Sequence, residues 1–488
     1  MKKHCLLLFC LICIPLMGQS TYKPDWESID KRPVPAWFEN AKFGIFIHWG
    51  LYSVPAWSPK GTYSEWYKYW LDKKTLMGNG NFTGTEIYDY HRKMYGEDFT
   101  YADFAPMFKA LSYDPEEWAD LFEHSGAKYV VLTTKHHDGF ALWPSREASI
   151  SYGRPWNSME IGAHRDLVGE YVNALRKTDI KVGCYFSLRE WDNPLYNDLF
   201  YERHWFPQLQ DLVNRYKPDL IWADGPDQIN DKQWQAERTL AWLYSESPVK
   251  DSIVVNDRWA NNTGKKHGDY YTREYSNTNN SYNKPWEECR GIGLSFGYNQ
   301  NEDLRDYTSP KALILTLVNI VSQGGNLLLD IGPNANGKIP PIMQERLLQI
   351  GKWLKVNGEA IYGTRAWGNS CQWSKGSKEW KSKEKHYVSG DAILKQTVDP
   401  DPGYAVKEVF FTKKGNNVYA ILPRYPKNKI VLKDIQTTGR TKITLLGSDK
   451  KVQWKQKGND IEVIMPLLYV DELPCDYAWV LKLEKISE

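Results

Sequence analysis

Carboxylates and imidazoles follow short apolar runs at several points in the chain. Asp224 ends the run IWAD, and Gly225 after it permits a sharp turn. Trp222 offers a flat apolar face on which a sugar ring can stack. A lone acid in this position could instead cap a helix. Its place after an apolar strand, beside an indole, favours a reactive carboxylate at Asp224.

Three histidines lie at similar positions. His48 follows FGIFI, and His136 and His137 are adjacent in KHHDGF. Neighbouring residues on an extended segment point to opposite sides, so this pair makes a poor metal chelate. Asp138 follows them and keeps a metal site open as an alternative, but no H-E-x-x-H motif is present. We therefore expect no bound metal ion.

Further polar and aromatic residues complete a candidate pocket. Glu65 and Trp66 lie in YSEWY, Tyr185 in GCYFS and Arg258 in VNDRW. Hydroxyl-binding groups between aromatic walls suit a sugar better than a phosphate. The sequence has no G-x-x-x-x-G-K-[ST] loop, no G-x-G-x-x-G after a strand and no G-x-S-x-G elbow. Nucleotide-dependent and serine-hydrolase chemistry are therefore disfavoured.

Cleavage of a glycosidic bond usually needs two carboxyl groups. Two glutamates are candidate partners for Asp224: Glu274 in DYYTREY and Glu287 in KPWEECRGIG. Both lie in residues 266–300, which are rich in Asn, Tyr and Gly. We interpret this segment as a long loop system over the mouth of the pocket. Either glutamate could instead form a surface salt bridge with a neighbouring arginine.

Short apolar strands alternate with amphipathic helices over about residues 40–330. The polar residues follow the apolar ones each time, so they fall at the carboxyl ends of strands, where barrel enzymes place their active sites. The pattern predicts an α/β fold with a TIM-type, (β/α)8-like barrel. Strands are expected at 43–50, 128–140, 181–191, 219–225, 252–259 and 324–333, and helices at 115–127, 165–179 and 206–218.

After about residue 365, clusters of Gly, Lys and Ser separate short β-like runs. The KKGNN segment at 413–417 is a hairpin signal. We predict a C-terminal antiparallel β-sandwich at 369–488, after a catalytic barrel at 21–368. Its strands are expected within 408–423, 429–434, 441–448, 460–466 and 477–483.

The first 20 residues have the pattern of a secretory signal peptide. Two lysines precede an apolar run from Leu6 to Met17, and Gly18 lies near a plausible cleavage site. The run is too short to span a membrane. Phe9 and Ile12 precede Cys10 and Cys13, which disfavours lipidation. We expect a soluble protein in a periplasm or outside the cell.

Composition excludes some functions and leaves others open. Lys plus Arg is 62 and Asp plus Glu is 60, so the chain lacks a basic nucleic-acid footprint. Four cysteines lie beyond the signal segment, too few and too widely spaced for a disulfide scaffold or a C-x-x-C motif. Cys184, inside an apolar strand, is expected to be buried and free. The 22 Trp residues suit sugar rings, although most aromatic side chains only pack.

Several long motifs, in order, resemble the α-L-fucosidases of glycoside hydrolase family 29. They span about residues 22–370 and are PDWESIDKRPVPAWFENAKFGIFIHWGLYSVPAW, YSEWY, GAKYVVLTTKHHDGFALW, VVNDRWA, GIGLSFGYN and VSQGGNLLLDIGPNANGKIP. The resemblance implies a (β/α)-type barrel with a C-terminal β-domain. It also implies exo-hydrolysis of terminal α-L-fucose from fucosylated glycans, with retention, by double displacement and without a cofactor.

The resemblance also assigns roles to residues. Asp224 matches the nucleophile. The acid/base is not at one alignable position in the family; we prefer Glu274 and keep Glu287 as the fallback. Positions that bind the fucose hydroxyls match His48, Glu65, Trp66, His136, His137, Tyr185 and Arg258. The apolar wall matches Phe46, Tyr63, Trp222 and Phe296.

Charge and burial should tune the two carboxyl groups. Arg258 is expected to hold down the pKa of the nucleophile. A loop lined by Tyr270, Tyr271 and Tyr275 is expected to raise the pKa of the acid by partial burial. Trp191 and Trp286 are expected to shape the side of the pocket that receives the leaving group.

Three other functions remain as alternatives. The same barrel could act on a related sugar such as an α-L-galactoside, or bind fucose without catalysis. A metal-dependent hydrolase would use His48, His136, His137 and an acid. The sequence leaves the fucosyl linkage and the oligomeric state open.

Overall fold

The computed structural model describes residues 21–74, 85–195, 199–225, 229–275, 282, 284–381 and 392–487. The predicted signal peptide lies outside these ranges. Within them, no helix combines the length and apolar character needed to cross a membrane.

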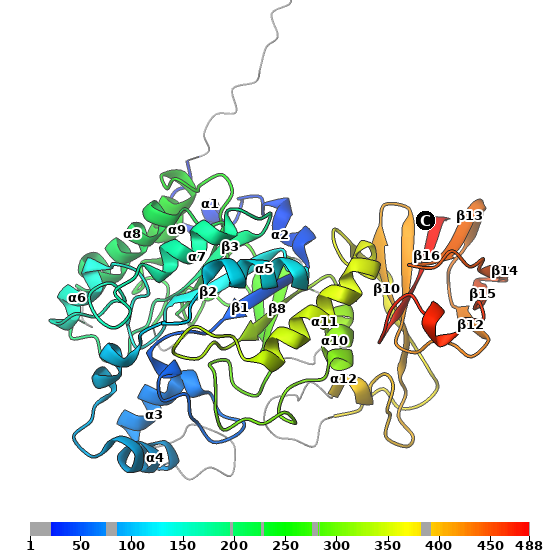
Figure 1. Cartoon of the computed structure of the whole chain (residues 1–488). Helices are drawn as coiled ribbons and strands as arrows, with labels where there is room; N and C mark the ends of the chain where they lie inside the picture. Colours follow the sequence, from blue (N-terminus) through cyan, green and yellow to red (C-terminus); the bar gives the residue numbers. More distant parts are fainter. Residues whose placement is uncertain are drawn as a thin grey trace, which may run out of the picture.

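Eight parallel strands form the sheet of the first domain (Figure 1). Along the sheet the order is β5-β4-β3-β2-β1-β8-β7-β6, so the first and last strands of the order are consecutive in the chain. This arrangement confirms the predicted TIM-like fold. The strands are β1 (Phe43–Ile47), β2 (Tyr129–Lys135), β3 (Lys181–Ser187), β4 (Leu220–Asp224), β5 (Val254–Val255), β6 (Tyr271–Glu274), β7 (Trp286–Gly291) and β8 (Asn326–Ile331).

Helices pack around this sheet, and local signals define their ends. The carboxylate of Asp114 accepts from the first backbone amides of α5, Pro115 occupies its first turn, and Gly126 ends it with φ +83°. The helices are α1 (Trp26–Ile29), α2 (Ala36–Ala41), α3 (Tyr67–Lys73), α4 (Glu86–Tyr95), α5 (Pro115–Ser125), α6 (Arg146–Tyr152), α7 (Leu167–Leu175), α8 (Phe206–Tyr216), α9 (Ala236–Ser245), α10 (Pro310–Ser322), α11 (Pro341–Asn357) and α12 (Ala392–Lys395). Shorter turns are η1 (Leu51–Ser53), η2 (Ser64–Trp66), η3 (Tyr101–Met107), η4 (Tyr201–Trp205), η5 (Gly358–Ala360) and η6 (Val470–Glu472).

The strands bury both of their faces. In β1, Ile45 and Ile47 belong to the core between the sheet and the helices, whereas Phe46 belongs to a separate cluster with Val131 and Trp222 inside the barrel. Alternate residues therefore face the helices and the barrel interior. Polar side chains that continue the inward series at the strand ends consequently meet at the top of the barrel.

The prediction of a loop system at 266–300 is wrong, because this segment contains β6 and β7. Strand β7 lacks the apolar pattern of the other buried strands because charged residues occupy several of its positions. Glu288 and Arg290 are both buried and are paired through a hydrogen bond of 2.8 Å from the arginine Nε. Arg273 of β6 lies 3.8 Å from the same glutamate. These buried ion pairs take the place of the hydrophobic residues that mark the other strands.

Two antiparallel sheets form the C-terminal domain, as predicted. The larger has the order β13-β16-β11-β10-β9 and the smaller β12-β15-β14. Their strands are β9 (Arg365–Trp373), β10 (Lys407–Lys414), β11 (Asn417–Leu422), β12 (Lys429–Leu432), β13 (Thr437–Leu445), β14 (Gln453–Lys457), β15 (Asp460–Ile464) and β16 (Trp479–Ile486). The predicted hairpin at KKGNN joins β10 to β11. The mostly polar β14 and the half-exposed β9 were not predicted.

The larger C-terminal sheet lies against α10 of the barrel through β9 and β10 (Figure 1). Trp353 of α11 donates its indole N–H to the carbonyl of Ala478 at 2.8 Å, and Thr412 of β10 donates to the carbonyl of Ala360 at 2.7 Å.

The four described cysteines are all free thiols, and Cys184 is buried as expected. They are Cys184, Cys289, Cys371 and Cys475.

Candidate active site

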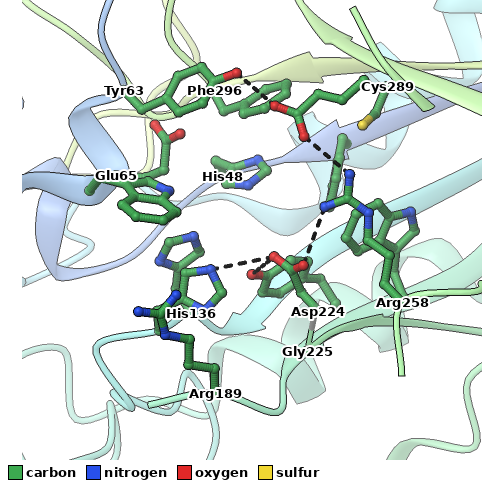
Figure 2. Close-up of a pocket in the computed structure, with 16 residues that line it drawn as sticks. His48, Tyr63, Glu65, His136, Arg189, Asp224, Gly225, Arg258, Cys289 and Phe296 are labelled. Carbon is green, nitrogen blue, oxygen red and sulfur yellow. Dashed lines mark hydrogen bonds and ion pairs between the residues drawn. The ribbon is translucent and has the colours of Figure 1, made fainter. Parts of the chain in front are cut away.

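A cavity of about 160 Å³ opens at the carboxyl ends of the barrel strands, with room for one small ring (Figure 2). Among the predicted site residues, all but Glu287 line it. They are Phe46, His48, Tyr63, Glu65, Trp66, His136, His137, Tyr185, Trp222, Asp224, Arg258, Glu274 and Phe296. Arg189, Gly225 and Cys289 also line it and were not predicted.

Asp224 is the last residue of β4 and is surrounded by donors. Tyr185 donates to Oδ2 at 2.8 Å, and Nε2 of His137 lies 3.4 Å from the same oxygen. Nη1 of Arg258 lies 3.3 Å from Oδ1. Burial by itself favours the neutral acid, but His137, Arg258 and Tyr185 together hold the pKa of Asp224 below its usual range. The carboxylate is therefore ionised at neutral pH.

Glu274 is the last residue of β6 and faces Asp224 across one guanidinium group. Nη2 of Arg258 lies 3.2 Å from Oε2 of Glu274, while Nη1 contacts Asp224 (Figure 2). Tyr63 donates to Oε1 of Glu274 at 2.7 Å. Arg258 is fixed in turn by Thr272, which accepts from Nε at 3.0 Å. One cation thus bridges two carboxyl groups in one cavity.

The expectation that Tyr270 and Tyr271 surround the acid is wrong. They stand at the start of β6, whereas Glu274 is at its end. Tyr270 stacks on Phe38 with ring centroids 4.1 Å apart, and Tyr271 packs edge-on against Tyr282. The tyrosine that donates to the Glu274 carboxyl group is instead Tyr63.

His136 and His137 both reach the cavity, so the prediction that they point to opposite sides is wrong. Strand β2 ends at Lys135, and the chain then turns through Gly139, which has φ +74°. Their ring centroids are only 4.4 Å apart. Nδ1 of His137 lies 2.6 Å from the hydroxyl of Ser187, which aims Nε2 at Asp224. The alternation rule fails here because the strand has already ended.

The metal alternative has little support from this geometry. Asp138 turns away from the cavity and accepts from Tyr101 at 2.7 Å. In the ranges that the structure describes, no three or more His, Cys, Asp and Glu side chains form a group that could hold a metal ion. Burial and the neighbouring imidazoles hold the pKa of His136 well below its usual value, so its ring is neutral and can donate one hydrogen bond and accept one in the cavity.

Glu65 presents an acceptor to the cavity. Its Oε2 accepts from the backbone amide of Gly297 at 2.8 Å and from Ser295 at 3.2 Å. Its Oε1 is buried and has no hydrogen-bond partner. Burial raises the pKa of Glu65 to about 7. Its free oxygen can accept a hydrogen bond from a ligand hydroxyl.

An apolar wall faces these polar groups. Phe296 stacks on His48 with ring centroids 5.0 Å apart and on Tyr63 at 5.2 Å. Phe46 lies 5.1 Å from Trp222. A ligand with one apolar and one hydroxylated side would match this division of the cavity.

Glu287 lies inside the barrel and does not line the cavity. Tyr129 donates to its Oε2 at 2.5 Å and the indole of Trp222 to its Oε1 at 3.0 Å. It therefore supports the Trp222 wall from behind. Its placement leaves Glu274 as the predicted acid/base candidate that shares the cavity with Asp224.

Replacing Glu287 by glutamine should remove a pH-dependent part of stability. Burial raises the pKa of Glu287 to about 7, although Tyr129 and Trp222 lower it by hydrogen bonding. A carboxyl with a raised folded-state pKa stabilises the fold below its unfolded value of 4.5, and this contribution is lost as the pH rises through 7. As the pH rises from acidic to mildly alkaline, the unfolding free energy of Glu287→Gln should increase relative to that of the wild type by on the order of 2–3 kcal/mol.

Urea unfolding of both proteins at several pH values across that range measures the difference. A difference in unfolding free energy that stays constant with pH would contradict the raised pKa of Glu287. Glutamine keeps one acceptor for Trp222 and a polar contact for Tyr129, so the variant should fold.

The two tryptophans expected near the leaving group lie in different places. Trp191 contacts Trp66 and His137, with ring centroids 5.4 and 5.3 Å apart, and so lies beside the cavity. Trp286 begins β7 at the opposite end of the barrel, where Arg273 lies 4.7 Å from its ring centroid. The expectation for Trp286 is therefore wrong.

The unpredicted lining residues differ in how they could have been found. Arg189 follows β3 in SLREW, so the rule of polar residues after strands would have found it. Cys289 lies on β7, within the segment predicted to be a loop, and its thiol donates to the carbonyl of Arg273 at 3.4 Å. Its inward position follows only from the observed strand.

Comparison with known proteins decides the family. A family model described as alpha-L-fucosidase matches residues 12–359, and one described as alpha-L-fucosidase C-terminal domain matches residues 404–484. The chain belongs to the α-L-fucosidase family. The family 29 resemblance is thereby confirmed, and the protein is a glycoside hydrolase.

Individual relatives of this fucosidase family cover nearly the whole chain. Tissue alpha-L-fucosidase of Homo sapiens is 44% identical over 96% of this chain and 92% of its own. Alpha-L-fucosidase of Branchiostoma floridae is 39% identical over 98% and 99%. The crystal structure of Thermotoga maritima alpha-fucosidase in complex with a mechanism-based inhibitor has a TM-score of 0.75, 35% identity, and coverage of 95% and 100%.

Proposed function

We propose that this protein is a retaining α-L-fucosidase that releases terminal α-L-fucose from fucosylated glycans by double displacement. Asp224 is the nucleophile and Glu274 the acid/base. The observation that carries the proposal is the bridge of Arg258 between these two carboxylates inside one cavity. Each carboxyl group contacts Arg258 within 3.3 Å, so both can act on one sugar bound in this cavity, as double displacement requires.

In the first displacement, an oxygen of Asp224 attacks C1 of the fucose. The bond from C1 to the leaving oxygen breaks, and Glu274 donates its proton to that oxygen. In the second, Glu274 takes a proton from water, whose oxygen attacks C1 and breaks the ester to Asp224. Fucose leaves with its original α configuration, and both carboxyl groups return to their starting states.

Arg258 contacts the reacting carboxyl group in each of the two displacements. Before the first, its charge keeps Asp224 ionised and therefore nucleophilic. Formation of the ester removes the charge of Asp224 and leaves Glu274 as the carboxylate paired with Arg258. In the second displacement Glu274 must accept a proton from water, and Arg258 still contacts its carboxyl group.

The divided lining of the cavity supports fucose as the ligand. Fucose has a methyl group at C5 where galactose has a hydroxymethyl group, and the wall of Phe46, Tyr63, Trp222 and Phe296 suits a methyl group. The donors and acceptors opposite suit ring hydroxyls. The signal-peptide pattern of residues 1–20 supports export, and we propose an exported enzyme.

Substrate panels test this function. We expect release of fucose from 4-nitrophenyl α-L-fucoside and from at least one linkage-defined fucosylated oligosaccharide. The matching α-L-galactoside, which adds one hydroxyl against an apolar wall, should show a kcat/KM about 10²-fold lower. Equal or faster cleavage of the galactoside would favour the related-sugar alternative, and binding without release would favour a lectin-like role. Loss of activity on exhaustive chelation would favour the metal-dependent alternative.

A further inference from the structure

Asp330 is a buried carboxyl that lies directly behind His48. The two residues come from neighbouring strands, because β1 pairs with β8 and Phe46 is in register with Asp330. Nδ1 of His48 lies 2.5 Å from Oδ1 of Asp330, whose side chain is 0% exposed. Asp330 does not line the cavity, whereas His48 does. No role in the proposed mechanism accounts for this carboxyl.

The surroundings of Asp330 oppose a negative charge. In the described part of the chain, its ion-pair contact is the His48 imidazole, and its Oδ2 is buried without a hydrogen-bond partner. Burial, and then the like charge of Glu65, raise the pKa of Asp330 well above its usual value. A buried carboxyl without a cation is far less costly when it holds its proton. Asp330 is accordingly a hydrogen-bond donor to His48.

The protonation state of His48 is consistent with a hydrogen bond donated by Asp330. Burial lowers its pKa to about 3, with the charge of His137 acting in the same direction and that of Asp224 opposing it. Its ring is therefore neutral and carries one proton. Because Nδ1 accepts from Asp330, that proton resides on Nε2. Stacking on Phe296, with the planes 15° apart, fixes the ring in its orientation at the cavity.

We propose that Asp330 is a positioning residue that keeps Nε2 of His48 protonated, so that His48 always offers a donor to a hydroxyl of the bound sugar. The sugar as ligand rests on the proposed function; the tautomer does not. Glu65 supplies the complementary group, because its Oε1 is an unpartnered acceptor on the same cavity (Figure 2). One sugar hydroxyl can donate a hydrogen bond to Glu65 and accept one from Nε2 of His48. The other tautomer of His48 has no proton on Nε2 and could not donate the second bond.

The tautomer of His48 can be measured by ¹⁵N NMR on unliganded protein that carries ¹⁵N-labelled histidine. His48→Gln identifies the His48 signals by their loss. We expect a protonated Nε2 and an unprotonated Nδ1 in the wild type. A protonated Nδ1 with a bare Nε2 would overturn the proposal. Because no substrate is present, this result stands apart from any failure to cleave α-L-fucosides.

Variants of Asp330 test the consequence. Asp330→Asn keeps an N–H donor toward Nδ1 and should retain the tautomer, with kcat/KM within about threefold of the wild type. Asp330→Leu removes the donor, so the tautomer with a protonated Nδ1 should appear in the NMR spectrum. Its kcat/KM should fall about tenfold, which corresponds to the loss of one hydrogen bond. Leu328→Val, on the same strand and facing the barrel interior, is the control for a packing defect.

A double-mutant cycle separates positioning from a general structural role. If Asp330 acts through His48, adding Asp330→Leu to His48→Gln should cause no further loss of kcat/KM. Losses that multiply would show that Asp330 acts independently of His48, and would overturn the proposal. If Asp330→Leu does not fold, Asp330→Asn and the wild-type spectrum still decide the tautomer.

Discussion

Replacing Asp224 by alanine is expected to lower kcat on an aryl α-L-fucoside by about 10⁴-fold or more, the scale seen when a catalytic nucleophile is lost. The variant has no oxygen within reach of C1, and Arg258 and His137 lose the carboxylate that they now contact. The space left by the side chain should admit a small anion. Azide should therefore restore part of the turnover and give β-L-fucosyl azide, because it attacks from the face that Asp224 occupied.

Asp219 provides a matched control for Asp224. It lies just before the same strand at its amino end, where Lys181 pairs with it at 3.1 Å. Asp219→Ala should retain kcat within about threefold, since this carboxyl is at the far end of the barrel. An Asp224→Ala enzyme with kcat within tenfold of the wild type would rule out Asp224 as the nucleophile.

Replacing Glu274 by alanine is expected to have an effect that depends on the leaving group. For a glycan, whose leaving oxygen needs a proton, kcat should fall by about 10²–10⁴-fold. For an aryl fucoside with a very acidic phenol, formation of the ester should be nearly normal, and its hydrolysis should become limiting. Azide, which needs no general base, should then raise turnover and give α-L-fucosyl azide.

Glu287→Gln distinguishes the two glutamates. Its carboxyl lies outside the cavity and holds Tyr129 and Trp222, so we expect kcat within about threefold of the wild type on both substrates. If Glu274→Ala keeps near-normal turnover on a poor leaving group and azide rescues nothing, the acid lies elsewhere. A large loss in Glu287→Gln would then point to Glu287.

The pocket was largely predictable because its residues follow a simple rule. Apolar runs such as FGIFI and DLIWAD end in the polar side chains of His48 and Asp224, and the parallel barrel brings these ends together. The same rule would also have found Arg189. The identity of each residue's role came from the resemblance to family 29, because strand position alone does not separate a nucleophile from a binding group.

The parts that sequence reasoning missed have physical causes. Strands β6 and β7 carry buried ion pairs in place of an apolar run, so their periodicity gives no strand signal. The two acid/base candidates were consequently placed on one loop, although β7 buries Glu287 inside the barrel. Asp330 was overlooked for the opposite reason. It lies within the apolar run NLLLDI, where only the observed strand register reveals His48 as its partner.

The charge on Arg258 is central to this account, because it contacts both catalytic candidates at once. Its placement also depends on a residue that sequence reasoning did not identify. Thr272 accepts from Nε of Arg258, and it is itself held by Asp257, which accepts from its hydroxyl at 2.7 Å. The bridge between Asp224 and Glu274 thus rests on a partly buried hydrogen-bond network at the ends of β4, β5 and β6.

The stereochemistry of the first product tests the double displacement most directly. Hydrolysis of an aryl α-L-fucoside can be followed by ¹H NMR at high enzyme concentration, before the released sugar mutarotates. Two successive displacements at C1 predict that α-L-fucose appears first and that the β anomer grows in later. Initial formation of β-L-fucose would show a single displacement by water, and would contradict the assignment of Asp224 as a covalent nucleophile.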